Sequence, residues 1–404
     1  MSTRTEHMNE IIGRLEPVML ENFEHLHRNP ELSFKEFKTT QFIKDILTGL
    51  GIEIQDIGME TGVVGLLKGR TDGPCIGLRA DIDGLPVNEL TSCPYKSRIE
   101  NVMHACGHDT HMGSLLGAAR ILSEMRDEIC GSVKFLFQPA EEKNLGAKLM
   151  IEHGALKNPD VDMMFGMHNQ PEIPAGQVGV KNGALMAAVN SYYINVYGKG
   201  GHGGVPHRNL DPVAASAAII NALQTIVSRR VEPRKACVIS LCSIHAGNGL
   251  ICNVTPSEVN MAGTVRWYDE ELGSSIEDMM RNVITNTAAA YGCTAELLYN
   301  YDQTSVTNPA DVYPIAVESV KAVCTSLGRA EPMDPIPSTG GEDFTFFMQE
   351  VPSFFYWLGV GNKELECVHP WHSPHFRADE RAIPVGAGVY ASSVFHAIDA
   401  IEKA

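Results

Sequence analysis

VKFLFQPAEE, residues 133–142, runs from a short apolar segment straight into a pair of carboxylates. Its first half, VKFLF, has the length and composition of a buried strand. Similar apolar segments occur at 63–67 (VVGLL), 75–79 (CIGLR) and 163–167 (MMFGM). Helical patterns at 16–27, 34–50 and 112–125 alternate with these segments. Such alternation predicts an α/β domain with a mostly parallel central sheet.

The pattern changes near Ala188, where the strand-like segment NSYYINVY (190–197) begins a different order of elements. Strands are predicted at 190–197, 237–244, 258–266 and 294–299, with helices at 211–229 and 271–291. This is the βαββαβ order of a ferredoxin-like domain. The α/β pattern resumes with a helix at 312–327, a strand at 354–360 and a helix at 384–401. We therefore expect a smaller domain, residues 187–304, inserted into a larger domain of residues 1–186 and 305–404.

Composition excludes several classes of partner. The chain has 404 residues, with 32 Lys+Arg against 49 Asp+Glu, a formal charge of −17. A nucleic-acid-binding protein usually carries a basic surface, and an anionic membrane also attracts basic segments. No apolar run approaches the ~20 residues of a membrane helix, and the first 20 residues do not resemble a secretory signal. We expect a cytoplasmic protein without nucleic-acid or membrane partners.

Ten cysteines are spread along the chain without CxxC pairs or regular spacing. In a long chain without a secretory signal this distribution predicts free thiols rather than a disulfide framework. Most of these thiols are expected to be buried as small hydrophobic side chains. Cys106 is the exception because of its polar neighbours.

Polar clusters follow several of the predicted strands. RADID continues from CIGLR, QPAEE follows VKFLF, His168 follows MMFGM, and HPWHSPHF (369–376) comes shortly after the strand at 354–360. In open α/β sheets, ligands bind beyond the carboxyl ends of the strands. The clusters are therefore expected to form one site.

The segment MHACGHDTH, residues 103–111, holds three histidines and a cysteine. In an extended loop, Cys106 and His108 would point to the same side and could share one ion. Thiolate and imidazole suit zinc, and imidazole with carboxylate also suits manganese, nickel or cobalt. Two other interpretations stay open at this point: a buried cysteine in a loop whose Asp109 caps the next helix, and a cysteine nucleophile with a histidine base.

The adjacent Glu141 and Glu142 favour a metal-dependent hydrolase over a cysteine nucleophile. One carboxylate can bind a metal ion while the other accepts a proton from bound water. On an extended backbone the two side chains would point in opposite directions and could take separate roles. The alternative is a solvated pair that begins a helix at 142–153. His168 and the histidines of HPWHSPHF could likewise be structural.

Taken together, the motifs resemble one family, the amidohydrolase branch of the di-metal aminoacylase/carboxypeptidase family, which includes hippurate hydrolases and indole-acetyl-amino-acid hydrolases. The resemblance extends from about Glu16 to Ile401. The family also has an α/β catalytic domain with an inserted βαββαβ lid. The motifs are RADIDGLPVNE (79–89), MHACGHDTHM (103–112), QPAEE (138–142), GMHNQP (166–171), GKGGHGGVPH (198–207), NVTPSEVNMAGTVR (253–266), GGEDF (340–344) and HSPHF (372–376).

The resemblance assigns a role to each motif of the larger domain. Glu141 falls on the position of the general base, and Asp81 on that of an aspartate that orients the metal centre. A histidine ligand stands two residues before this aspartate in the wider family, whereas this chain has Arg79. The implied cofactor is a pair of divalent ions, zinc or manganese, with nickel or cobalt as alternatives. The implied metal ligands are Cys106, His108, Glu142, His168 and His372.

The inserted domain carries further implied site residues. His202 matches a histidine that stabilises the oxyanion and, in family dimers, reaches the active site of the partner. Asn253 and Arg266 stand at positions suited to hold a substrate carboxylate, and Glu342 lies near the site in the family. From the residues alone, His202 could equally be a histidine in a glycine-rich loop, and Arg266 could form a salt bridge at a strand end.

The function that the resemblance implies is hydrolysis of the amide bond of N-acyl amino acids, hippurate-like compounds among them, to a carboxylic acid and an amino acid. A homodimer formed through the inserted domain is also implied, and further assembly stays open. Two alternatives remain: a dipeptidase or carboxypeptidase of the same family, and a non-catalytic peptide-binding protein that kept the fold.

Overall fold

The computed structural model describes residues 3–249, 251–327 and 332–403. Contacts divide the chain into two compact units. Unit 1 consists of Met1–Gly183, Asn308–Ile336 and Asp343–Ala404, and unit 2 of Ala184–Thr307 and Pro337–Glu342.

Unit 1 is built on a seven-stranded sheet with the order β1-β2-β4-β3-β5-β15-β6. The four inner strands β4, β3, β5 and β15 run parallel, and the outer strands pair antiparallel. The apolar segments named above lie in buried parts of these strands. The expected α/β fold with a mostly parallel sheet is confirmed. The strands are β1 (Glu53–Gln55), β2 (Val63–Lys68), β3 (Thr71–Asp81), β4 (Cys130–Gln138), β5 (Met163–Pro174), β6 (Val178–Gly179) and β15 (Ser353–Gly361).

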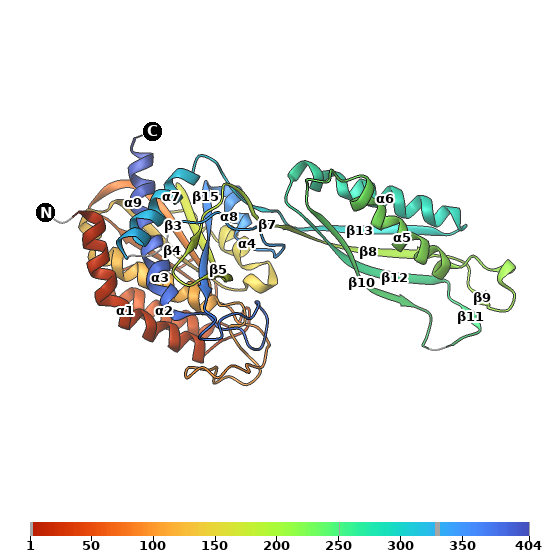
Figure 1. The fold of residues 1–404 in the computed structure, drawn as a ribbon, viewed down its shortest axis with the longest axis horizontal. Helices are drawn as coiled ribbons and strands as arrows, with labels where there is room; N and C mark the ends of the chain where they lie inside the picture. The colour runs from red at the N-terminus through yellow and green to blue at the C-terminus, as the bar shows by residue number, and fades with distance from the viewer. Residues whose placement is uncertain (1–2, 250, 328–331, 404) are drawn as a thin grey trace. The chain divides into compact units, whose positions relative to one another are not determined.

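Helices cover both faces of this sheet (Figure 1). On one face, α3 and α9 contact the strands, with α1 and α7 packed over them and α2 beside α3. The short α4 and α8 lie on the other face. Helix α9 is buried along most of its length because it lies between the sheet and the outer helices. The helices are α1 (Arg4–Arg28), α2 (Phe37–Gly49), α3 (His108–Glu124), α4 (Gly146–Glu152), α7 (Tyr313–Ser326), α8 (Thr345–Glu350) and α9 (Ile383–Ile401).

Helix α1 begins a dozen residues earlier than the pattern at 16–27 predicts. Thr3 caps it, and Glu6 completes a capping box. Met8, Ile11 and Ile12 face the core, while the intervening residues are mostly polar.

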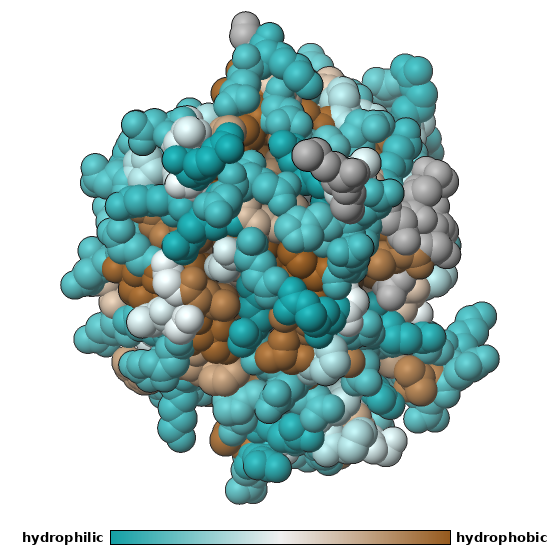
Figure 2. All heavy atoms as spheres, turned by 90° about the vertical axis from the view of Figure 1, so that its left-hand side faces the viewer, coloured by the Kyte–Doolittle hydropathy of each residue, from teal (hydrophilic) through white to brown (hydrophobic). Residues whose placement is uncertain are grey.

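Figure 2 views unit 1 from the left-hand side of Figure 1, and hydrophilic side chains cover most of this face. Among the described residues, no helix is long and apolar enough to cross a membrane.

Unit 2 has the predicted ferredoxin-like fold. Its antiparallel sheet has the order β10-β12-β8-β13, and helices α5 and α6 pack together against it. Asp211 caps α5, Pro212 lies in its first turn, and Asp269 caps α6. The elements are β8 (Ala188–Tyr197), α5 (Pro212–Arg229), β10 (Cys237–Ala246), β12 (Glu258–Trp267), α6 (Glu270–Ala290) and β13 (Thr294–Gln303).

Two further short strand pairs occur, β9 (Gly201–His202) with β11 (Val254–Thr255) and β7 (Gly183–Met186) with β14 (Val306–Asn308). All ten cysteines are free thiols, as expected, and six of them are buried.

Candidate metal centre

The polar residues that follow β3, β4 and β5 gather in unit 1. Asp81 is the last residue of β3, and Glu141 and Glu142 follow β4 in a short 3-10 turn, Glu141–Lys143. The apolar run predicts that His168 lies at the end of its strand. Strand β5 runs on to Pro174, so His168 lies inside the strand instead. His168 nevertheless lies just beyond the last β3–β5 pair, Arg79 with Gly166, and so reaches the edge where β3 stops.

Cys106 and His108 come from a tight turn, so the expectation of an extended loop is wrong. Gly107 is the N-cap of α3 with φ 81°, and His108 is the first helical residue. A side chain at position 107 would meet Asn169 Nδ2 at 2.4 Å, so the turn requires glycine. Asp109, expected to cap the helix, lies in its first turn instead.

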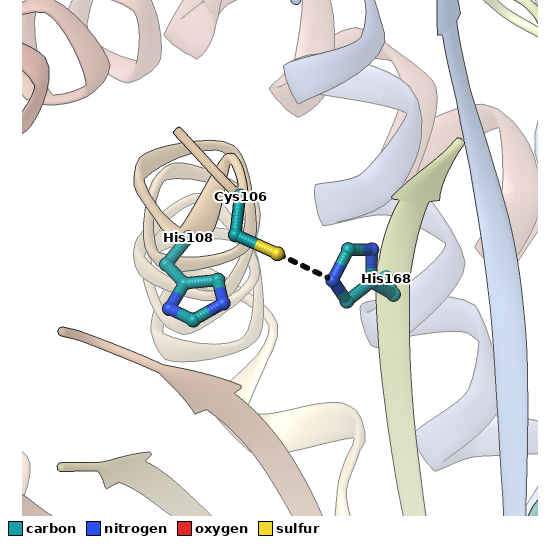
Figure 3. A group of neighbouring side chains, drawn as sticks. All are labelled: Cys106, His108 and His168. Carbon is teal, nitrogen blue, oxygen red and sulfur yellow. Dashed lines mark hydrogen bonds between the residues drawn. The ribbon is translucent and has the colours of Figure 1, made fainter. Parts of the chain in front are cut away.

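Cys106, His108 and His168 form a buried group whose possible ligand atoms all lie within 4.8 Å of one another. Cys106 Sγ is 3.4 Å from His168 Nε2. Figure 3 shows that Cys106 and His108 project from the start of α3 and His168 from β5, with the thiol directed at the His168 ring. Sulfur and imidazole nitrogen are the donors that zinc prefers.

Hydrogen bonds fix the orientation of both imidazoles. His108 Nδ1 donates to the carbonyl of Asp83 and His168 Nδ1 to that of Asn169, both at 2.8 Å. A carbonyl can only accept, so in the neutral form each ring carries its hydrogen on Nδ1 and a lone pair on Nε2. His108 Nε2 is buried and has no hydrogen-bond partner among the residues that the structure describes. Metal-binding histidines are oriented through the second nitrogen in this way.

Glu142 and His372 extend the group. Glu142 Oε1 lies 3.5 Å from His372 Nε2 and 3.9 Å from His108 Nε2. It is buried, and no described residue forms a hydrogen bond with it. The backbone N–H of His372 donates to the carbonyl of Ala105, which fixes this loop beside the Cys106 turn. His369 and His375 instead lie against each other, with ring centroids 5.4 Å apart.

Glu141 faces the same histidine, because its Oε2 is 3.9 Å from His108 Nε2. The two glutamates are not on an extended backbone, and that expectation is wrong. They lie in the 3-10 turn after Ala140, whose φ is 53°. The other oxygen of Glu141, Oε1, accepts the N–H of Asp343 at 3.4 Å.

This donor set fits divalent ions. Burial raises the pKa of the Cys106 thiol well above its usual range, and the Glu142 carboxylate adds to this effect. Burial acts to lower the pKa of His108, but Asp81, Asp83 and Cys106 outweigh it and raise that pKa well above its usual value. The centre therefore favours a positive charge, which a metal ion would supply. Cys106 belongs both to the group with the two histidines and to a second group with Glu142 and His372, so one thiolate could serve two ions.

A buried charge network supports Asp81. Arg79 donates to Asp81 Oδ2 at 2.8 Å and to Asp343 Oδ1 at 2.9 Å. His111 Nδ1 pairs with Asp81 Oδ1 at 2.6 Å, while His111 Nε2 accepts the N–H of Asn169 at 2.8 Å. Burial acts to raise the pKa of Asp81, but His108, His111 and Arg79 together hold it well below its usual value. His111 received no role from the sequence, although it belongs to MHACGHDTH.

Two carboxylates that the sequence reasoning missed hold the turn that carries the glutamates. Asp83 accepts the backbone N–H groups of Glu141 (3.1 Å) and Glu142 (3.2 Å). Glu36 accepts the N–H of Ala140 at 2.9 Å. Asp83 belongs to the RADID cluster, so its position after a predicted strand could have indicated a site residue. Glu36 lies 104 residues before Ala140, and no local pattern indicates this contact.

The other predicted site residues belong to unit 2, and their roles stay predictions. His202, on β9, is exposed, and its Nδ1 accepts the N–H of Gly204 at 2.9 Å. The carbonyl of Asn253 accepts the N–H of Gly203 at 2.8 Å. Arg266 is half-buried on β12 and donates to Thr264 Oγ1 at 2.6 Å. Glu342 is buried.

Comparison with known proteins identifies the family. Residues 77–396 match the family described as "Peptidase family M20/M25/M40". The chain belongs to this family. The resemblance found in the motifs is thereby confirmed, and the matched range spans both units.

Curated relatives of the M20 family cover nearly the whole chain. The N-acetylcysteine deacetylase of Bacillus subtilis is 40% identical over 93% of this chain and 96% of its own length. Thermostable carboxypeptidase 2 of Saccharolobus solfataricus is 37% identical over 96% and 97%. The IAA-amino acid hydrolase ILR1-like 2 of Arabidopsis thaliana is 36% identical over 91% and 82%.

A solved M20 structure has the same fold. The YXEP protein of Bacillus subtilis, described as a dinuclear metal-binding peptidase, superposes with a TM-score of 0.84 at 36% identity, covering 96% of this chain and 99% of that one. With the hydrolase relatives and the donor groups of unit 1, this identifies the chain as a metal-dependent amidohydrolase of the M20 family.

Proposed function

We propose that this chain hydrolyses the amide bond of N-acyl amino acids with two divalent ions, zinc or manganese, held by Cys106, His108, Glu142, His168 and His372. A deacetylase of N-acetylcysteine and a hydrolase of IAA-amino acids among the relatives support this substrate class. The observation that carries the proposal is the carboxylate of Glu141, held at Oε1 by Asp343 and placed 3.9 Å from the unpartnered His108 Nε2.

Glu141 is the proton-transfer group in this proposal. When bound, the ions lower the pKa of a water molecule and polarise the substrate carbonyl. Glu141 accepts the proton of the attacking water and then delivers it to the nitrogen of the leaving amino acid. Its position beside a ligand histidine suits this role, because a base must lie within reach of the water it deprotonates.

The residues of unit 2 complete the proposed mechanism. Because His202 Nδ1 accepts a backbone N–H, the neutral ring carries its hydrogen on Nε2 and can donate it to the developing oxyanion. Arg266 would bind the substrate carboxylate with its planar guanidinium, together with Asn253. Glu342 is proposed to line the substrate site.

A carboxypeptidase or dipeptidase is the second candidate, because a thermostable carboxypeptidase is a relative of similar identity. Both substrate classes present an amide next to a carboxylate, so the centre of unit 1 does not separate them. The difference lies in the group on the acyl side, which is apolar in an N-acyl amino acid and carries an amine in a dipeptide.

The test is a substrate panel with controlled metal content. Protein stripped with chelator would be refilled with zinc, manganese, nickel or cobalt and assayed with N-acetyl, N-benzoyl and indole-acetyl amino acids and with dipeptides. Activity on N-acyl amino acids that disappears on stripping and returns with one ion supports the proposal. Turnover confined to dipeptides would favour the second candidate. If the protein bound none of the added ions, the result would instead support a non-catalytic peptide-binding protein.

The proposal also includes a homodimer formed through unit 2 and a cytoplasmic location. Light scattering coupled to size-exclusion chromatography would give the oligomeric state, with a variant carrying charged residues on the edge strand β10 as the comparison. Cell fractionation would test the location.

A further inference from the structure

A second buried group of metal-binding side chains lies in unit 1, made of His27, Glu89 and Cys93. His27 is near the end of α1, and the other two come from the loop between β3 and α3. All three side chains are buried, and their possible ligand atoms lie within 4.8 Å of one another. The mechanism proposed above uses none of them.

The contacts on the two sides of the His27 ring differ. Nδ1 lies 2.6 Å from Asp109 Oδ2, a short charge-assisted hydrogen bond. Nε2 lies 3.3 Å from Glu89 Oε1 and 3.8 Å from Cys93 Sγ. The donor and acceptor atoms of an ionic hydrogen bond normally lie ~2.7–2.9 Å apart. The longer distances at Nε2 leave more room on this side of the ring than a direct hydrogen bond would.

The three atoms are spaced as ligands of one tetrahedral ion. Zinc bonds of ~2.0 Å to nitrogen or oxygen and ~2.3 Å to sulfur put neighbouring ligand atoms ~3.3–3.6 Å apart. Here the separations are 3.3 Å (Nε2–Oε1), 3.5 Å (Sγ–Oε1) and 3.8 Å (Sγ–Nε2). Three pairs of the candidate centre have similar separations: 3.4 Å for Cys106 with His168, 3.9 Å for His108 with Glu142, and 3.5 Å for Glu142 with His372.

We propose that His27, Glu89 and Cys93 bind a third divalent cation, zinc or a cation of similar softness, separate from the pair at the candidate centre. A set of one sulfur, one nitrogen and one oxygen suits zinc better than magnesium or calcium, which prefer oxygen alone. Asp109 completes the arrangement, because ligand histidines commonly donate their second N–H to a carboxylate.

Neighbouring groups fix the carboxylate, and the loop that carries it reaches the surface. Glu89 Oε2 accepts the N–H of Ser97 at 2.7 Å, which keeps Oε1 directed at His27. The hydroxyl of Thr91 contacts Glu89 Oε1 and lies 3.3 Å from Cys93 Sγ. Thr91 is half-exposed and Ser92 is exposed, so the loop that carries Glu89 and Cys93 reaches the surface beside the group.

The first test counts bound metal in the full-length protein. After chelation and dialysis against zinc, elemental analysis should find three zinc ions per wild-type chain and two in Cys93→Ala and in Glu89→Gln. Cys293→Ala is the matched control, because this buried thiol belongs to unit 2 and contacts the carbonyl of Tyr291. It should keep all three. Equal zinc content in wild type and Cys93→Ala would overturn the proposal. Melting of the metal-free proteins would check that each variant folds.

The second test uses the sulfur signal and avoids the thiolate of the candidate centre. Cobalt added to Cys106→Ala should still give the thiolate-to-cobalt charge-transfer absorption, and the signal should vanish in the Cys106→Ala/Cys93→Ala double variant. Absence of that absorption in Cys106→Ala would contradict the assignment. Neither readout needs a substrate, so a failure of the proposed amidase activity would not affect either result.

Discussion

At the residue scale, Glu141 and Glu142 are neighbours in sequence but have different surroundings. Glu142 Oε1 lies within 4 Å of two histidine nitrogens, and in the described part of the chain it has no hydrogen-bond partner. Glu141 is held at Oε1 by the N–H of Asp343, and only its Oε2 approaches His108. The surroundings of Glu142 suit a metal ligand, and those of Glu141 suit a base that must stay beside the centre without binding to it.

Substitution of the two glutamates should separate catalysis from metal binding. Glu141→Gln keeps the size of the side chain and its acceptor for Asp343 but cannot take a proton. We expect kcat to fall by ~10²–10⁴ or more with metal content unchanged. Glu142→Gln removes a negatively charged oxygen ligand, so this variant should lose bound metal as well as activity. Elemental analysis beside steady-state kinetics gives both readouts. Near-normal turnover in Glu141→Gln would show that another group is the base.

His202 should act on turnover rather than on metal binding. If its Nε2–H donates to the oxyanion, His202→Ala should lower kcat by ~10²–10³ and leave the metal content and the melting temperature unchanged. His207 is the matched control, because it is another exposed histidine of unit 2, in the neighbouring 3-10 turn. An equal effect of His207→Ala would indicate a disturbed loop instead of a lost donor.

At the element scale, the turn that carries the glutamates is held from outside itself. Ala140 has φ 53°, a conformation that costs energy for a residue with a side chain. Three successive N–H groups, those of residues 140–142, donate to the carboxylates of Glu36 and Asp83. These bonds come from separate parts of the chain and offset the cost. The turn therefore depends on tertiary contacts rather than on local preference.

The buried Glu36 should make stability depend on pH. Burial raises the pKa of Glu36 from 4.5 to about 7. As pH rises from 4.5, the unfolded chain loses this proton first, while the folded chain keeps it until about pH 7. The folded state binds more protons in this window, so stability should fall between pH 4.5 and 7 and then level off.

Glu36→Gln isolates this effect, because the amide still accepts the N–H of Ala140 but does not titrate. The free energy of unfolding would be measured with denaturant at pH 5 and pH 8 for both proteins. From pH 5 to pH 8, the difference between variant and wild type should shift in favour of the variant by ~1–3 kcal/mol. Glu31→Gln, a partly exposed neighbour, controls for the general loss of a charge. Parallel pH profiles for wild type and Glu36→Gln would contradict the raised pKa.

The elements were predictable where one local pattern dominates, and the turns were not. The apolar runs of β3, β4 and β15 lie within a few residues of their predicted places, and α5 begins one residue after its predicted start. The turn at Cys106–His108 was predicted wrongly because its form depends on Gly107 fitting against Asn169, which is distant in sequence. His27, Glu36 and His111 were missed for the same reason: each has partners that no local pattern reveals.

At the scale of the whole molecule, the two units divide the proposed chemistry. The predicted metal ligands and the predicted base all belong to unit 1, although they are spread from Cys106 to His372. His202, Asn253 and Arg266 belong to unit 2, which has its own hydrophobic core under α5 and α6. The predicted ligands alone therefore come from segments far apart in the sequence of unit 1, which explains why no single motif was decisive.

This division predicts that metal ions stabilise one unit and not the other. Ions bound to the folded donors raise the stability of unit 1 by ~2.7 kcal/mol at a concentration of 100 times the dissociation constant. Unit 2 contributes no ligand to the predicted centre, and its core is separate. Calorimetry of the chelated protein should therefore show two transitions, of which zinc shifts one upward.

Cys106→Ala should reduce that shift, whereas Cys293→Ala should leave it intact because this thiol is buried in unit 2. If zinc raised both transitions equally, the two units would unfold as one, and the separate stability inferred from their cores would be wrong.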